Sequence, residues 1–150
     1  MHMSAEPGIE ILNLINAIER RTTTRMQRLL RESGLGLAAM EARTLRFVAR
    51  HPGCTQNDIV RASGRDKAQI ARIIKTLRGR DLVTRPAAEG GGRRPQPLVL
   101  TAAGTAVHAR AESLRANTAR ELAGELDPAE RAQLETLLGR LSPLGPADQA

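Results

Sequence analysis

Apolar residues follow helical spacing along almost the whole chain, and this spacing is interrupted once, between residues 82 and 100. Within the interruption, Leu82–Arg85 and Leu98–Leu100 are typical of short strands, and the loop between them contains three consecutive glycines. On both sides, apolar residues recur every three to four positions, which predicts helices. These helices are expected at residues 8–33, 38–50, 55–63, 66–80, 101–126 and 127–142. The pattern therefore predicts a mainly α fold with one small β-hairpin.

Capping residues support several of these helix boundaries. Thr55 and Asp58 have the spacing of a reciprocal capping box at the start of the third helix. Asp127, Pro128 and Glu130 combine an acidic cap, a proline at the first helical position and an acid at the third, which predicts the start of the sixth helix.

All of the net charge of the chain lies between residues 61 and 100. This segment contains ten basic and three acidic residues, which gives +7, and the whole chain also carries +7. Like charges confined to one region repel each other, whereas an anionic polymer neutralises them. The charge distribution therefore indicates an anionic partner, with nucleic acid favoured over a membrane surface.

Composition narrows the class of partner. The 150 residues suit a single domain, and no apolar run approaches the ~20 residues that a membrane-spanning helix needs. Phe47 is the single aromatic residue among Phe, Tyr and Trp, which argues against folds that stack nucleic-acid bases on aromatic side chains. Recognition of double-stranded DNA through its grooves and backbone is the better interpretation. A single cysteine, Cys54, fits a reducing cytoplasm.

The fourth helix has the composition of a DNA-reading surface. On a helical wheel, Ile70, Ile73, Ile74 and Leu77 cluster within about 100° of arc. The remaining surface mixes cations, an amide and small residues, and it lacks the interleaved glutamates of an ordinary solvated helix. Arg pairs with guanine, Gln with adenine, and Ala or Thr contacts a thymine methyl group. The predicted DNA-binding residues of this region are Arg65, Lys67, Ala68, Gln69, Arg72, Lys75 and Thr76.

The loop of the hairpin supplies two further candidates. Arg93 and Arg94 follow the three glycines, and a loop of this kind can place an arginine in a narrow minor groove. A short helix, a turn, a basic helix and a two-stranded wing together form a winged helix-turn-helix arrangement.

These segments resemble the MarR family of bacterial transcriptional regulators. The resemblance rests on Cys54–Ile59, Arg65–Arg72, Leu77–Arg85, the pair Arg93-Arg94, and Leu98–Gly104 with its Leu-Thr-x-x-Gly pattern. The Arg-Asp-Lys-Ala start of the fourth helix is most similar to the MexR-type multidrug-efflux repressors.

The resemblance implies a homodimer with one recognition helix per subunit in the major groove, and a wing arginine at position 93 or 94. It departs from the family at Gly92, where an aspartate often orients that arginine. It also implies a small-molecule effector, often an aromatic or phenolic acid, between the dimer helices and the DNA-binding lobes. Arg20, Arg21 and Arg25 are expected as its anion partners.

The terminal helices favour a dimer independently. They contain more Leu and Ile than one small winged-helix core can cover, and a two-fold dimer would bury the excess. We therefore expect residues 8–33 and 101–144 to form the dimerisation region and residues 38–100 the winged helix-turn-helix lobe.

The sequence thus predicts a cytoplasmic, homodimeric, sequence-specific DNA-binding regulator that acts as a ligand-responsive repressor at a pseudo-palindromic operator. Two alternatives remain open: a sequence-independent architectural DNA-binding protein, and a helical adaptor whose basic block binds an acidic protein. No cofactor, membrane contact or catalytic constellation is predicted. The pair His51 and Cys54 lacks the further ligands of a metal site, and a buried, unreactive Cys54 is favoured over a redox switch.

Overall fold

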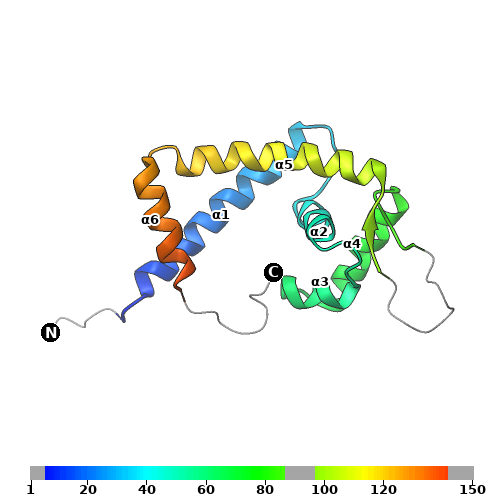
Figure 1. The fold of residues 1–150 in the computed structure, drawn as a ribbon, viewed down its shortest axis with the longest axis horizontal. Helices are drawn as coiled ribbons and strands as arrows, with labels where there is room; N and C mark the ends of the chain where they lie inside the picture. The colour runs from blue at the N-terminus through cyan, green and yellow to red at the C-terminus, as the bar shows by residue number, and fades with distance from the viewer. Residues whose placement is uncertain (1–5, 87–96, 142–150) are drawn as a thin grey trace.

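The computed structural model describes residues 6–86 and 97–141, and it is mainly helical with one two-stranded hairpin. Figure 1 shows a long arm formed by α1, α5 and α6, and a compact group formed by α2, α3, α4 and the hairpin at one end of it. The elements are α1 (Ile9–Glu32), α2 (Ala39–Arg50), α3 (Gln56–Ser63), α4 (Lys67–Gly79), β1 (Val83–Thr84), β2 (Val99–Leu100), α5 (Ala102–Ala123) and α6 (Pro128–Gly139). The predicted fold class, a winged helix-turn-helix with added helices, is confirmed.

We call the group from α2 to β2 the lobe, and α1, α5 and α6 the frame. The lobe is built on a helix-turn-helix, in which Gly64 ends α3 with a positive φ of 65° and Asp66 caps α4 by accepting a hydrogen bond from the Gln69 N–H. The predicted capping box at α3 is present, because Thr55 and Asp58 exchange hydrogen bonds of 2.8 and 3.2 Å.

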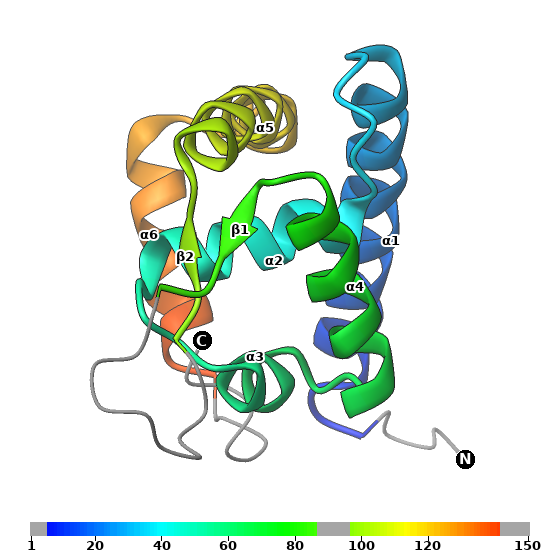
Figure 2. The ribbon, with the colours of Figure 1, turned by 90° about the vertical axis from the view of Figure 1, so that its right-hand side faces the viewer.

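The hairpin is short and is extended by one neighbouring bridge. β1 and β2 are antiparallel, with Val83 opposite Leu100 and Thr84 opposite Val99. Leu98, which is fully buried, forms an isolated bridge with Cys54, so the second strand also contacts the segment before α3. Figure 2 shows the two strands between α5 and α3. The expected strands at 82–85 and 98–100 are therefore correct in position but longer than the structure has them.

The motif Leu100-Thr101-Ala102-Ala103-Gly104 joins the hairpin to the frame. Thr101 caps α5 by accepting from the Gly104 N–H, and it donates to the Asp81 carbonyl at 2.5 Å. A Cβ atom on Gly104 would lie 1.9 Å from the Leu82 carbonyl oxygen. Only glycine allows this close approach, so the first turn of α5 packs directly on the backbone that leads into β1.

The hydrophobic core lies mostly in the lobe and at its junction with α1 and α5. Leu30, Leu45, Ile70, Leu77 and Leu98 are among its largest fully buried side chains. The stripe predicted for the fourth helix is confirmed, because three of its four members are buried and Ile73 is half-buried.

The frame differs from the sequence-based expectation in the end of its fifth helix, and many of its apolar residues are exposed. The fifth helix was expected to reach about residue 126 but ends at Ala123, and Gly124 lies at its C-cap, where it weakens helix continuation. Along the apolar repeat of α1, Leu30 is buried, whereas Ile11, Ile15 and Ile18 are 39–50% exposed. α6 has no buried residue within the described chain.

Candidate nucleic-acid interface

The candidate interface is the outer face of α4 together with the turn before it. Three apolar side chains of α4 (Ile70, Ile74 and Leu77) fix this helix on the core, so the opposite side faces solvent. Most of the predicted DNA-binding residues of this region are exposed, and Gln69 is half-buried; the exposed ones are Arg65, Lys67, Ala68, Arg72, Lys75 and Thr76.

The cations of this face have no ion-pair partner in the part of the chain that the structure describes. Among the described residues, no carboxylate lies within the 4.0 Å ion-pair distance of Arg65, Lys67, Arg72 or Lys75. Unneutralised cations on one rigid surface can pair with phosphates or with guanine edges.

Other arginines of the basic segment have structural contacts instead. Arg80 donates to the carbonyls of Leu35 and Gly36 at 2.8 and 2.7 Å, so it holds the connection between α1 and α2. Arg61 pairs with Asp58. The capping bond from Thr55 and the pairing with Arg61 together hold the pKa of Asp58 below its usual value. Arg61 and Arg80 therefore have partners within the chain, unlike the cations of the α4 face.

The two wing arginines, Arg93 and Arg94, lie outside the described residues, as does Gly92. Arg85, at the base of the hairpin, is half-buried.

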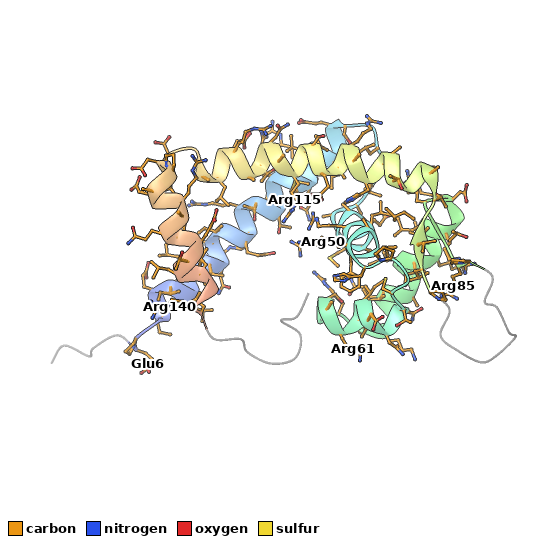
Figure 3. All side chains as sticks on the ribbon, viewed as in Figure 1. Glu6, Arg50, Arg61, Arg85, Arg115 and Arg140 are labelled. Carbon is orange, nitrogen blue, oxygen red and sulfur yellow. The ribbon has the colours of Figure 1, made fainter. Side chains whose placement is uncertain are left out.

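A cavity of about 720 Å³ lies between the lobe and the frame. Its walls come from α1, α2, α3 and α5, and Figure 3 shows Arg50 and Arg115 between α2 and α5. Arg20, Arg21 and Arg25 do not line it; Arg25 instead forms a 2.7 Å ion pair with Glu121. Five other arginines line it, and sequence spacing does not indicate their convergence because it depends on the packing of α2 against α5 and the turn before α4: Arg43, Arg46, Arg50, Arg65 and Arg115.

One half-buried ion pair lies in the cavity wall. Arg46 of α2 donates to Glu112 of α5 at 2.8 Å, and these side chains are 22% and 34% exposed. Burial acts to raise the pKa of Glu112, but the hydrogen bond and charge of Arg46, with the charges of Arg115 and His108, lower it overall. This pair connects the lobe to the frame through a charge-assisted contact.

Cys54 is buried, as the favoured interpretation of the sequence expected. Burial raises the pKa of its thiol to about 11, and the negative charge of Asp58 adds to this effect. The position before α3, which could lower a thiol pKa, is outweighed by desolvation. Cys54 is therefore a poor candidate for an oxidant-sensing thiolate.

Residues 6–86 and 97–141 contain neither a metal-binding cluster nor a membrane-spanning helix. Within these ranges, no group of three or more His, Cys, Asp or Glu residues could hold a metal ion. None of the helices there combines the length and apolar character needed to cross a membrane.

Known proteins share both part of this sequence and its fold. The model of the MarR family matches residues 33–94, which contain the helix-turn-helix and β1. The fold is that of MarR-family regulators. No curated protein matches the sequence.

Three solved structures illustrate the similarity. The chain is 21% identical to a mutant of Escherichia coli MarR complexed with operator DNA, at a TM-score of 0.75, over 93% of this chain and 100% of that one. It is 23% identical to a MarR family protein of Mycobacterium tuberculosis in complex with p-aminosalicylic acid, at a TM-score of 0.73, over 91% and 98%. A MarR regulator from Methanosarcina mazei Go1 gives 20% identity and a TM-score of 0.75, over 86% and 91%.

Proposed function

We propose that this protein is a MarR-family transcriptional regulator of the cytoplasm that binds a specific double-stranded DNA operator as a homodimer. The observation that carries the proposal is the outer face of α4, where Arg65, Arg72 and Lys75 are exposed without carboxylate partners among the described residues. This face occupies the recognition-helix position of a winged helix-turn-helix fold. The similar E. coli protein was solved with operator DNA, which supports the same use here.

On this proposal, α4 lies in the major groove. Arg72 recognises guanine, Gln69 adenine, and Ala68 and Thr76 contact thymine methyl groups. Lys67, Lys75 and Arg65 contact phosphates or base edges near them. Arg93 or Arg94 of the wing enters the adjacent minor groove.

The exposed apolar residues of the frame support a homodimer. Eleven large aliphatic side chains of α1, α5, α6 and the residues just after α6 are 39–55% exposed in the single chain. They are Ile9, Ile11, Leu12, Leu14, Ile15, Ile18, Leu122, Leu134, Leu137, Leu138 and Leu141. Exposed apolar surface on this scale is typical of a protein interface, and a two-fold interface between copies would present two recognition helices to one duplex.

The cavity between lobe and frame supports a ligand-responsive repressor of the MexR type. Its arginine-rich wall suits an organic anion, and the similar M. tuberculosis protein was solved with salicylic acid and with p-aminosalicylic acid. With Phe47 the single aromatic residue of its lining, the cavity would hold such a ligand mainly by aliphatic and charged contacts.

Selection of bound sequences from a random duplex pool tests the proposed function. We expect a palindrome whose half-sites are separated by ~10 base pairs, the spacing of one helical turn. Arg72→Ala and Gln69→Ala should each weaken the selected duplex by ~1–3 kcal/mol and leave random DNA nearly unchanged.

The matched control is Arg140→Ala, which removes an exposed arginine at the end of α6, away from the apolar face of that helix and far from α4 (Figure 1). Equal losses on selected and random DNA would instead support an architectural DNA-binding protein. Absence of duplex binding at low salt would support an adaptor for an acidic protein.

A further inference from the structure

Arg65 belongs to two surfaces. It lies in the turn between α3 and α4, directly before the cap residue Asp66, and is exposed on the DNA-facing side of the lobe. It also lines the cavity between lobe and frame, together with Ser63 of the same turn region. Arg72 and Lys75, the other main cations of the candidate interface, do not line that cavity.

The backbone at Arg65 is held in place while its side chain is unattached. The Arg65 N–H donates to the Ser63 hydroxyl at 3.2 Å, and the next residue caps α4. Within the described chain the guanidinium has no hydrogen-bonded or ion-paired partner. A fixed base with a long free side chain allows the guanidinium to point either into the cavity or toward DNA.

The charges that line the cavity determine whether the Arg65 guanidinium favours the cavity or the outer face. The lining contains five arginines, and Glu112 is its single carboxylate among the described residues. Glu112 is already paired with Arg46 at 2.8 Å and with Arg115 at 3.4 Å. An empty cavity therefore has a net positive lining that repels a fifth guanidinium, whereas an anion within it would attract one.

We infer that an organic anion in the cavity draws the Arg65 guanidinium inward and so competes directly with DNA for this side chain. The inference rests on the proposed function and specifies its regulation. It differs from a change in the separation of the two recognition helices, because the loss of DNA affinity depends on one side chain. Each ligand then weakens the binding of the other by the same factor.

A covalently attached anion tests this without knowledge of the natural effector. Ala116 lines the cavity from α5, so Ala116→Cys introduces a thiol there that sulfonatoethyl methanethiosulfonate converts to a sulfonate-bearing disulfide. Methyl methanethiosulfonate gives a neutral adduct for comparison. The unsubstituted chain, treated identically, is the control for Cys54, whose raised pKa of about 11 and burial make it slow to react. Mass spectrometry verifies each adduct.

We expect the sulfonate adduct to weaken binding of the selected duplex about tenfold, within the usual range of coupling between sites, and the neutral adduct to have little effect. In an Arg65→Gln background the effect of the sulfonate should fall to about twofold or less. In an Arg72→Gln background, which lowers DNA affinity without altering the cavity, the tenfold effect should remain.

Two results would overturn the inference and leave the proposed function intact: an equal sulfonate effect with and without Arg65, or equal effects of the charged and neutral adducts. Failure of the unmodified chain to bind any duplex would instead overturn the proposed function. Ala119→Cys provides a second attachment point on the same wall if Ala116→Cys impairs folding.

Discussion

The apolar residues of the lobe are buried within a single chain, whereas those at the ends of the frame are exposed. In the lobe, Leu45, Ile70 and Leu77 are fully buried within a single chain. In the frame, Ile15 and Leu138 repeat with the same helical spacing but are 39% and 48% exposed. The core of the lobe is therefore closed within one chain, with help from Leu30 of α1, whereas α6 and the first half of α1 leave their apolar faces exposed. Periodicity alone does not distinguish these situations, because it shows which face is apolar and not what covers that face.

The largest expected effect is loss of the proposed dimer, with the lobe left folded. The double variant Leu134→Asp, Leu138→Asp places two carboxylates on the exposed apolar face of α6, where a dimer would bury them at a cost of several kcal/mol each. We expect it to be monomeric by sedimentation, with a dimer dissociation constant raised at least ~1000-fold, since 1.4 kcal/mol corresponds to tenfold.

Gln133→Glu adds charge to the same helix without replacing an apolar residue and is the matched control. A double variant that stays dimeric would show that α6 is not part of the interface.

The next effect concerns the contact between the hairpin and the frame. Gly104→Ala forces a Cβ atom against the Leu82 carbonyl, with an unrelaxed distance of 1.9 Å. We expect a loss of about 3 kcal/mol in the free energy of unfolding, measured by urea denaturation, because the obstacle is backbone and not a flexible side chain.

Gly79→Ala is the control, since the added Cβ meets nothing within 4 Å beyond adjacent residues and its own helix backbone, and the substitution favours helix by up to about 1 kcal/mol. Equal stabilities for the two variants would contradict the close packing of α5 on Leu82.

Smaller changes in stability and in DNA affinity distinguish the structural arginines of the basic segment from the proposed DNA-binding ones. Arg80→Gln removes the bonds to the Leu35 and Gly36 carbonyls and should cost about 1–2 kcal/mol of stability. Arg72→Gln should leave stability within about 0.5 kcal/mol and weaken operator binding. Thermal unfolding and DNA titration of both variants check this reciprocal pattern, and a loss of DNA affinity without destabilisation in Arg80→Gln would contradict it.

The smallest expected effect is pH-dependent. Because the folded-state pKa of Glu112 is lowered, the ionised form contributes stability above the ordinary glutamate value of 4.5, and this is lost as pH falls through the folded value. Glu112→Gln should therefore cost about 1 kcal/mol at pH 7 and almost nothing at low pH. Urea denaturation across pH checks the convergence. In Glu121→Gln, which affects the exposed pair with Arg25, the loss should be smaller at every pH.

Local signals in the sequence were sufficient for the order of the elements and for most of their boundaries. The caps at Thr55 and Asp127 mark helix starts within one residue, because capping depends on neighbours in sequence. The charged surface of α4 could be assigned for the same reason, since a helical wheel needs no tertiary information. The resemblance implied an effector between the lobe and the dimer helices, but the arginines of the cavity wall could not be predicted, because Arg46, Arg65 and Arg115 line it together only through tertiary packing. The Leu-Thr-x-x-Gly motif was visible, but the contact of Gly104 with Leu82 joins residues 22 positions apart.

The packing of Gly104 on Leu82 fixes the first turn of α5 against the hairpin. The helix has 22 residues and so extends about 33 Å at 1.5 Å per residue. A tilt of α5 by about 5° about its first turn would move its far end by roughly 3 Å. A small adjustment of the lobe would thus be amplified where α5 leads into α6. Conversely, contacts that fix the far end of α5, such as the ion pair of Glu121 with Arg25 of α1, would limit the range of angles open to the lobe.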